Sequence, residues 1–206
     1  STRGYVEVWR DDFLNFNTSN WSKGMTYDRD PTVHQKWNRE TGGEHLLNDK
    51  YAGYNMDDNV GTWDGILYLR NEKENIIGTS PVGNFEYTTG WINSLRKRTI
   101  SPNTYLEIRA KFPVGPKVWP AIWLVPDSLE TWPPEIDIWE YFGTLFTENV
   151  QDKMVMRYIY GTSSTVTNYG TFANVSDHSS RLSGGFNRRF GATSWHVYGW
   201  EWTPTI

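Results

Sequence analysis

The chain has 206 residues, a formal net charge of −4 and no cysteine. The lack of cysteine excludes disulfides, thiol nucleophiles and zinc–thiolate sites, and the acidic balance excludes the basic field typical of nucleic-acid binding. No window approaches the 18 consecutive apolar residues of a membrane span, so we expect no membrane span and no nucleic-acid partner.

Aromatic residues make up 16% of the chain, with 12 Trp and 12 Tyr. Tryptophans beyond the needs of a core often stack on the C–H faces of sugars or build interfaces. A large β core that uses Trp is the alternative interpretation.

Short alternating runs, separated by clusters of Gly, Pro, Asn and Asp, predict strands along the whole chain. They cover residues 5–9, 65–71, 90–98, 105–112, 121–125, 135–142, 153–161 and 195–202. We therefore expect an all-β protein, a sandwich or jelly roll of antiparallel sheets, with one domain over residues 1–206. The polar stretches 22–62 and 162–194 are predicted to be long surface loops.

The run 135–142 contains three carboxylates, Glu135, Asp137 and Glu140. Strict alternation would place Glu140 on the core face, where an unpaired charge is costly. A β-bulge near Trp139 would return Glu140 to the face of the other two acids. We predict this bulge, with all three carboxylates on one concave, solvent-reaching face.

Such a cluster suits glycoside hydrolysis, in which a retaining enzyme holds its two carboxyl groups about 5–5.5 Å apart. Crowding and partial burial are expected to raise the pKa of one member, which would then stay protonated as an acid near neutral pH. The alternative is an ordinary strand with an acidic solvent face.

The stretch "EIDIWE" at 135–140 resembles the E-x-D-x-x-E motif of glycoside hydrolase family 16 in its bulged form. The stretch "YLEIRAKFPVGPKVWPAIWLVP" is similar to the family's central strands, and "WHVYGWEWTP" to the strand before its closing segment. The resemblance implies a β-jelly-roll of two curved antiparallel sheets with an open concave cleft. It also implies an endo-acting, retaining hydrolase of β-linked polysaccharide that needs no catalytic cofactor, with Glu135 as nucleophile, Asp137 as helper and Glu140 as acid/base.

Further expectations follow from the resemblance. The family normally continues beyond the equivalent of residue 206, so we expect the catalytic domain to be truncated here before its last strands. We expect a monomer that is secreted, periplasmic or on the cell surface, although this chain contains no signal peptide. Some members bind a structural calcium, for which Asp11 and Asp12 are candidates or simply solvated acids.

The predicted substrate is β-1,3-glucan, because the stretch "VWPAIWLVP" resembles the Trp-bearing strand of β-1,3-glucanases (laminarinases). Two differences favour a red-algal galactan such as porphyran, agarose or carrageenan: Trp91 replaces the family's Arg, and Arg157 replaces a His common in laminarinases. Basic residues at 96–98 and 188–189 could contact sulfate groups. A non-catalytic carbohydrate-binding module on the same fold is a second alternative.

Candidate substrate-binding residues fall into two groups. Those expected to stack on sugar rings, with core packing as the alternative for each, are Trp91, Trp119, Trp123 and Trp139. Those expected to bind sugar or sulfate groups through polar atoms are Asn93, Arg96, Arg157 and Tyr158. His196 is expected to orient a neighbouring group, because the three acids already fill the catalytic roles. No metal ligands are predicted for the catalytic site.

Overall fold

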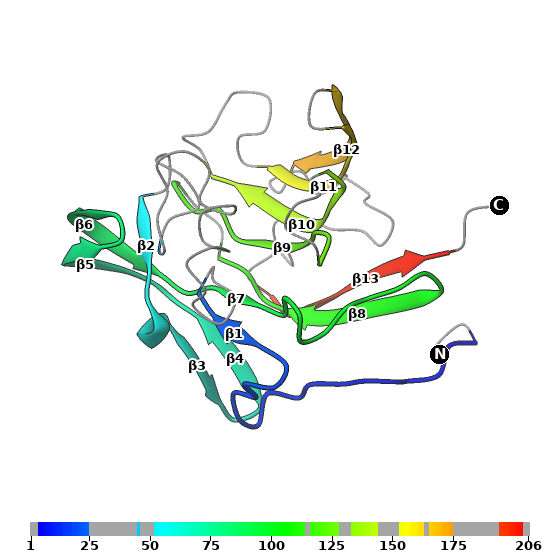
Figure 1. Ribbon diagram of the computed structural model, residues 1–206, viewed down its shortest axis with the longest axis horizontal. Coiled ribbons are helices and arrows are strands. Elements are labelled where there is room, and N and C mark those ends of the chain that lie inside the picture. Colours follow the sequence, from blue (N-terminus) through cyan, green and yellow to red (C-terminus); the bar gives the residue numbers. More distant parts are fainter. Residues whose placement is uncertain are drawn as a thin grey trace. The chain divides into compact units, whose positions relative to one another are not determined.

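The computed structural model describes residues 4–24, 45, 52–113, 116–127, 133–143, 153–162, 165–174 and 194–203. The chain forms two compact units, Ser1–Ile100 and Ser101–Ile206. Within the described residues, every regular element is a strand except one short 3₁₀ helix, η1 (Asp57–Asn59), as Figure 1 shows. The all-β prediction is therefore confirmed. Among these residues, no helix is long and apolar enough to cross a membrane.

The described residues of the first unit form seven short strands in three small sheets. Their bounds are β1 (Ser22–Lys23), β2 (Gly53–Asn55), β3 (Val60–Trp63), β4 (Ile66–Leu69), β5 (Asn71–Thr79), β6 (Val82–Thr89) and β7 (Ile92–Asn93). The sheets are β1–β7, β3–β4 and β2–β6–β5. The β3–β4 hairpin turns through Asp64 and Gly65, whose φ angles of 52° and 69° are those that an Asp-Gly hairpin turn requires.

One pairing in this unit departs from the antiparallel prediction. Strand β2 runs parallel to β6, with Gly53 opposite Tyr87 and Asn55 opposite Thr89. A long connection through η1, β3, β4 and β5 separates the two strands, so no hairpin fixes their relative direction. The antiparallel prediction holds for the other strand pairs of the described residues.

The second unit contains the longer strands. Their bounds are β8 (Thr104–Ala110), β9 (Ala121–Leu124), β10 (Glu135–Phe142), β11 (Lys153–Thr162), β12 (Thr165–Asn174) and β13 (His196–Trp202). Strands β12, β11, β10 and β9 form a four-stranded antiparallel sheet in that order, and β13 pairs with β8. Both groups are visible in Figure 1. The strand with the three acids thus lies inside its sheet, between β9 and β11.

The core of the second unit is built around Trp139 and Tyr141 on β10, which are 0% and 1% exposed. Phe112 stacks on Trp139 with ring centroids 3.9 Å apart, and Tyr198 meets the same indole edge-on at 6.0 Å. Val118 and Met156 complete the cluster. The prediction that Trp139 stacks on sugar is therefore wrong, because its ring is enclosed by other side chains.

Several predicted elements also differ from the structure. Residues 5–9 form no strand, because Val6 and Val8 are both exposed and no neighbouring strand pairs with them among the described residues. The predicted loop 162–194 contains β12, which pairs with β11 along its whole length. Its sequence, "TVTNYGTFAN", lacks an apolar alternation, so backbone pairing rather than hydrophobic pattern defines this strand.

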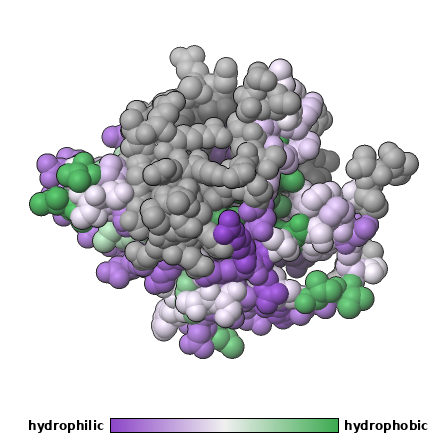
Figure 2. Space-filling model, in the orientation of Figure 1, coloured by the Kyte–Doolittle hydropathy of each residue, from purple (hydrophilic) through white to green (hydrophobic). Residues whose placement is uncertain are grey.

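The sequence patterns did not predict the β5–β6 hairpin. The tip of this hairpin is apolar. Figure 2 shows hydrophobic side chains gathered there, and both Ile77 and Val82 are largely exposed. The run "NEKENIIGT" of β5 places five polar residues ahead of its only aliphatic pair, which obscures a strand pattern.

The core position of Trp139 can be tested by truncation. We expect Trp139→Ala to lower the free energy of unfolding by about 3–5 kcal/mol, since it removes a fully buried ring. Trp63→Ala is the matched control, because Trp63 is 75% exposed, and it should change stability by no more than about 0.5 kcal/mol. Urea unfolding of both variants measures the difference. Equal effects of the two variants would contradict the core assignment.

Candidate active site

A register shift in β10 brings two of the acids to one face of the sheet. Asp137 lies opposite Trp123 on β9, and Glu140 lies opposite Ala121. Trp123 and Ala121 are two residues apart and share a face, so Asp137 and Glu140 share that face as well. The shift between Asp137 and Glu140 occurs against β11 too. The predicted bulge is therefore confirmed, and it leaves Trp139 on the opposite, core face.

Arg157 connects the two carboxylates. It lies directly opposite Asp137 on β11, which puts its side chain on the acid face. Its Nε donates to Asp137 Oδ2 at 2.9 Å, and its Nη2 donates to Glu140 Oε2. One guanidinium thus forms an ion pair with each of two acids.

Trp119 contacts the same site from the segment before β9. Its indole Nε1 donates to Glu140 Oε1 at 2.9 Å, while its side chain stays 38% exposed. The ring packs against Phe142 with centroids 5.1 Å apart, and Arg157 also lies over the Phe142 ring. The sequence interpretation missed Phe142, although its position two residues after Glu140 places it on the acid face.

Asp137 and Glu140 are buried, with 2% and 4% of their surfaces exposed. The prediction of a solvent-reaching face is therefore wrong for these two acids, although Glu135 remains partly exposed. The error arose because Arg157 was expected to face the substrate. Its guanidinium instead supplies the paired charge that buried carboxylates require.

Burial has a large effect on how the two acids titrate. Desolvation, followed by the negative charge of Asp137, raises the pKa of Glu140 to about 7, although Arg157 and Trp119 act in the opposite direction. Desolvation and the charge of Glu135 raise the pKa of Asp137 to about 6. Near neutral pH this face can therefore hold a proton on a buried carboxyl group beside an exposed aromatic ring. A general acid requires such a protonated carboxyl group, and the sequence predicted that one acid of the cluster would have a raised pKa.

Two other residues predicted to bind substrate lie away from the acid face. Tyr158 follows Arg157 on β11, so alternation directs it to the face opposite the acids, where it stacks on Tyr160. His196 on β13 meets Tyr198 edge-on, and Tyr198 packs on Trp139. The structure thus groups Trp119, Trp123 and Arg157 with the acids, and does not group Tyr158 with them.

Three further candidates belong to the first unit, where they stay predictions. Trp91 accepts a backbone hydrogen bond from Gly24. Asn93 donates to the Gly24 carbonyl at 2.9 Å and accepts from the Leu95 amide at 3.2 Å. Arg96 has a left-handed backbone, with φ at 55°.

The basic cluster at 96–98 has structural contacts. Lys97 donates to the Thr18 and Trp21 carbonyls at 2.8 and 3.1 Å. Arg98 Nε donates to the Asn20 side chain at 2.9 Å. These contacts tie the cluster to the N-terminal segment. The second basic cluster, residues 188–189, lies outside the described residues.

Asp11, a candidate ligand for the possible structural calcium, is hydrogen-bonded within the N-terminal segment, and the calcium site stays a prediction. One oxygen accepts from the Phe13 amide at 3.0 Å, and the other accepts from Asn20 and Trp21 side chains at 3.2 and 2.8 Å. Asp12 lies 3.8 Å from an Arg10 nitrogen. In the described part of the chain, no group of three or more His, Cys, Asp or Glu side chains is placed to hold a metal ion.

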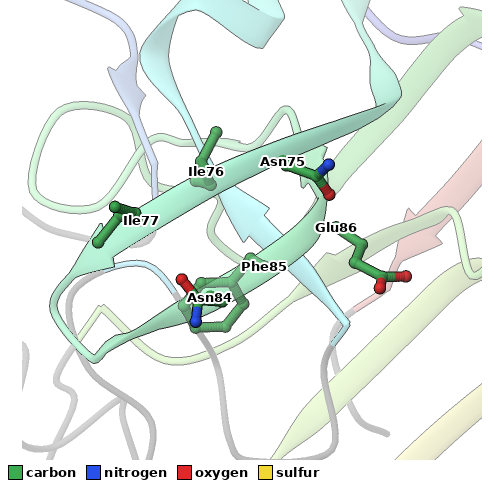
Figure 3. Close-up of a pocket in the computed structure, with 6 residues that line it drawn as sticks. All are labelled: Asn75, Ile76, Ile77, Asn84, Phe85 and Glu86. Atoms are coloured by element: carbon green, nitrogen blue, oxygen red, sulfur yellow. The ribbon is translucent and has the colours of Figure 1, made fainter.

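The first unit also has a shallow pocket of about 300 Å³ between β5 and β6. Figure 3 shows that its lining comes from the two facing strands of one hairpin, and it includes Ile76, Asn84 and Phe85. Glu86 is its single carboxylate. The pocket therefore lacks the paired acids of β10.

The sequence has curated relatives that it covers only in part. A β-glucanase of Rhodothermus marinus is 29% identical over 192 residues, which cover 89% of this chain and 59% of the relative. A β-1,3-glucan-binding protein of Penaeus monodon is 28% identical over 68% of this chain and 42% of the relative. The chain thus spans little more than half the length of the first relative. No protein-family model matches the sequence.

The fold is that of solved jelly-roll proteins. An endo-β-1,3-glucanase from Pyrococcus furiosus aligns with a TM-score of 0.63 at 21% identity, over 96% of this chain and 67% of that one. An endo-β-1,3(4)-glucanase of family GH16 gives 0.63 at 20% identity, over 97% and 69%. Fold and site thus define an all-β jelly-roll protein with paired acids on one strand. The second of these structures is described as a family GH16 enzyme, the family whose motif residues 135–140 resemble.

The raised pKa values predict a pH-dependent stability. A proton on Glu140 is bound more tightly in the folded than in the unfolded protein, so its stabilisation is complete below pH about 4.5 and is lost as the pH rises through about 7. We expect the free energy of unfolding to fall by about 3 kcal/mol across this window from Glu140 alone. Urea unfolding at a series of pH values measures it.

Glu140→Gln is the matched variant for this measurement, because its amide cannot titrate. We expect it to reduce the pH dependence of stability between pH 4.5 and 7 by the share of Glu140, and to leave the share of Asp137, whose pKa is about 6. An unchanged slope in this variant would mean that Glu140 titrates normally in the folded protein.

Proposed function

We propose that this chain carries the catalytic site of an endo-acting, retaining hydrolase of β-1,3-glucan. The observation that carries the proposal is the buried pair Asp137 and Glu140, with raised pKa values, beside the exposed indole of Trp119. The bulged form of the E-x-D-x-x-E motif accounts for the placement of these acids. The similarity to a β-glucanase supports the substrate class.

In the proposed mechanism, Glu135 attacks the anomeric carbon while Glu140 gives its proton to the departing glycosidic oxygen. The bond to the leaving sugar breaks as a covalent glycosyl-enzyme forms. A water then donates a proton to Glu140 and attacks the same carbon, which releases Glu135. Asp137 lies between these residues on β10, and we assign it the helper role of orienting the carboxylates.

The charge of the site supports a neutral polymer over a sulfated galactan. Three carboxylates stand against one described guanidinium on this face, and that guanidinium, Arg157, is already paired with two of them. A sulfated chain would therefore meet a negative surface. Two of the other suggested sulfate ligands, Lys97 and Arg98, are bound to protein groups in the first unit.

A non-catalytic glucan-binding module remains the alternative, because one relative is a β-1,3-glucan-binding protein. A binding module has no need for a buried acid whose pKa lies near neutrality. Because polymeric glucans cannot enter a cell intact, we propose that the protein works outside the cytoplasm. We also propose that it acts as a monomer. This location stays a prediction.

The first test is a reducing-end assay on laminarin, mixed-linkage glucan, agarose, porphyran and κ-carrageenan. We expect cleavage of laminarin, no measurable turnover by Glu135→Gln, and a loss of about 10²–10⁴ in kcat for Glu140→Gln. Laminarin binding by Glu135→Gln should persist. Binding without turnover by the native protein would favour the module, and cleavage of galactans alone would overturn the glucan assignment.

Trp119 is expected to serve both the acid and the sugar, and two substitutions separate these roles. Trp119→Phe keeps a flat ring but removes the donor to Glu140, so it should alter the pH profile of kcat more than KM. Trp119→Ala removes both and should also raise KM, because it removes the flat apolar ring, and stacking contacts of aromatic rings contribute about 0.5–1.5 kcal/mol. Equal KM values for the two variants would exclude sugar stacking by this ring.

A further inference from the structure

Both oxygens of Glu140 face N–H donors. Oε1 accepts from the Trp119 indole at 2.9 Å, and Oε2 accepts from Arg157 Nη2. This arrangement fits a carboxylate, which only accepts hydrogen bonds. Asp137 lies within hydrogen-bonding reach of Glu140, so a protonated Glu140 can donate its O–H to that carboxylate. Protonation also removes the charge that Arg157 pairs with, so the acid form that the proposed reaction requires holds Nη2 less strongly than the carboxylate does.

Arg157 is the donor that can withdraw from Glu140 and still keep an ion pair, the one with Asp137. Its Nε keeps Asp137 Oδ2 at 2.9 Å as a second partner. The Trp119 indole has a single N–H, and its ring is packed against Phe142. A guanidinium on a flexible side chain can withdraw one branch, whereas the packed indole cannot turn its N–H away.

We propose that Arg157 is a proton-coupled clamp on the acids: it holds Asp137 and Glu140 while both are ionised, and it releases Glu140 but keeps Asp137 when Glu140 takes up a proton. The proton comes from solvent, and neutral Glu140 then donates it in a hydrogen bond to Asp137 in place of its ion pair with Arg157. Arg157 is then a positioning residue that sets when the acid is available. The inference deepens the proposed function and rests on it for the role of Glu140.

The charges around Glu140 favour such coupling. Among side chains that the structure describes, the charged groups on this face are Glu135 and Asp137 on β10 and Arg157 on β11, while β9 contributes none. Burial and the Asp137 charge raise the pKa of Glu140, whereas Arg157 and Trp119 lower it. Protonation of the Glu140 carboxyl group and its ion pair with Arg157 therefore oppose each other.

The clamp can be tested without substrate by NMR titration of the whole chain, with ¹³C-labelled carboxyl groups and ¹⁵N-labelled arginines. Glu140→Gln and Arg157→Gln identify the two residues' signals. We expect the Arg157 guanidinium signals to change with the same pH midpoint as the Glu140 carboxyl, and to lose that change in Glu140→Gln. Arg157 signals that do not respond to the Glu140 titration would overturn the proposal.

Removing the clamp should make the acid easier to protonate. In Arg157→Gln we expect the Glu140 midpoint to rise by about 1 unit or more, and the alkaline limb of the activity profile on laminarin to move with it. Arg109→Gln is the matched control, since it removes the same charge from an arginine that lies over Trp195 in the same unit. It should leave the Glu140 midpoint in place.

A second variant covers the case in which Arg157→Gln does not fold. Arg157→Lys keeps the charge but has one ammonium group, which cannot hold both acids as a planar fork does. In Arg157→Lys we expect the Glu140 midpoint to rise, but by less than in Arg157→Gln, which removes the charge. An unshifted midpoint in a folded Arg157 variant would contradict the clamp. Because the NMR readout needs no turnover, an inactive protein with a working clamp would refute only the proposed function.

Discussion

The structure of the second unit depends on one extra residue in β10. The bulge between Asp137 and Glu140 resets the alternation of the strand, so the acids gather on one face while Trp139 and Tyr141 turn to the other. In a regular strand, Glu140 would enter the core and an indole would replace it beside Asp137. The same bulge therefore places the residues of the hydrophobic core and those of the candidate site, so removing it would displace both sets.

Burial of two carboxylates on that face creates the second constraint. An isolated buried charge is expensive, and a buried pair of like charges is more so. The described contacts offset this cost with one guanidinium and one indole N–H, both of which reach across from neighbouring segments. The compensation is incomplete, because both acids still have raised pKa values. Such residual conflict is typical of places where function rather than stability selects the residues.

Structure could be predicted from the sequence where a strand pattern was strong and where one placement of a charged side chain would have a high free-energy cost. Run 135–142 matched β10 because the strand pattern is strong, and the bulge followed from the cost of burying Glu140. Trp139 was placed on the wrong face, since its face depends on where within the strand the extra residue lies. Strand β12 was missed because its pairing with β11 uses the backbone, which leaves little trace in side-chain pattern. The parallel β2–β6 pair is a long-range contact that no local signal specifies.

Arg157 shows most clearly what a single sequence lacks. Twenty residues separate it from Asp137, so its partner becomes visible only when the register of β10 and β11 is known. Without the register, a basic residue near a carbohydrate site reads as a ligand for an anionic substrate. With it, the same residue is a counter-ion within an acidic cluster, and the surface offered to a polymer is aromatic and negative rather than basic. The register thus changes the expected substrate as well as the role of the residue.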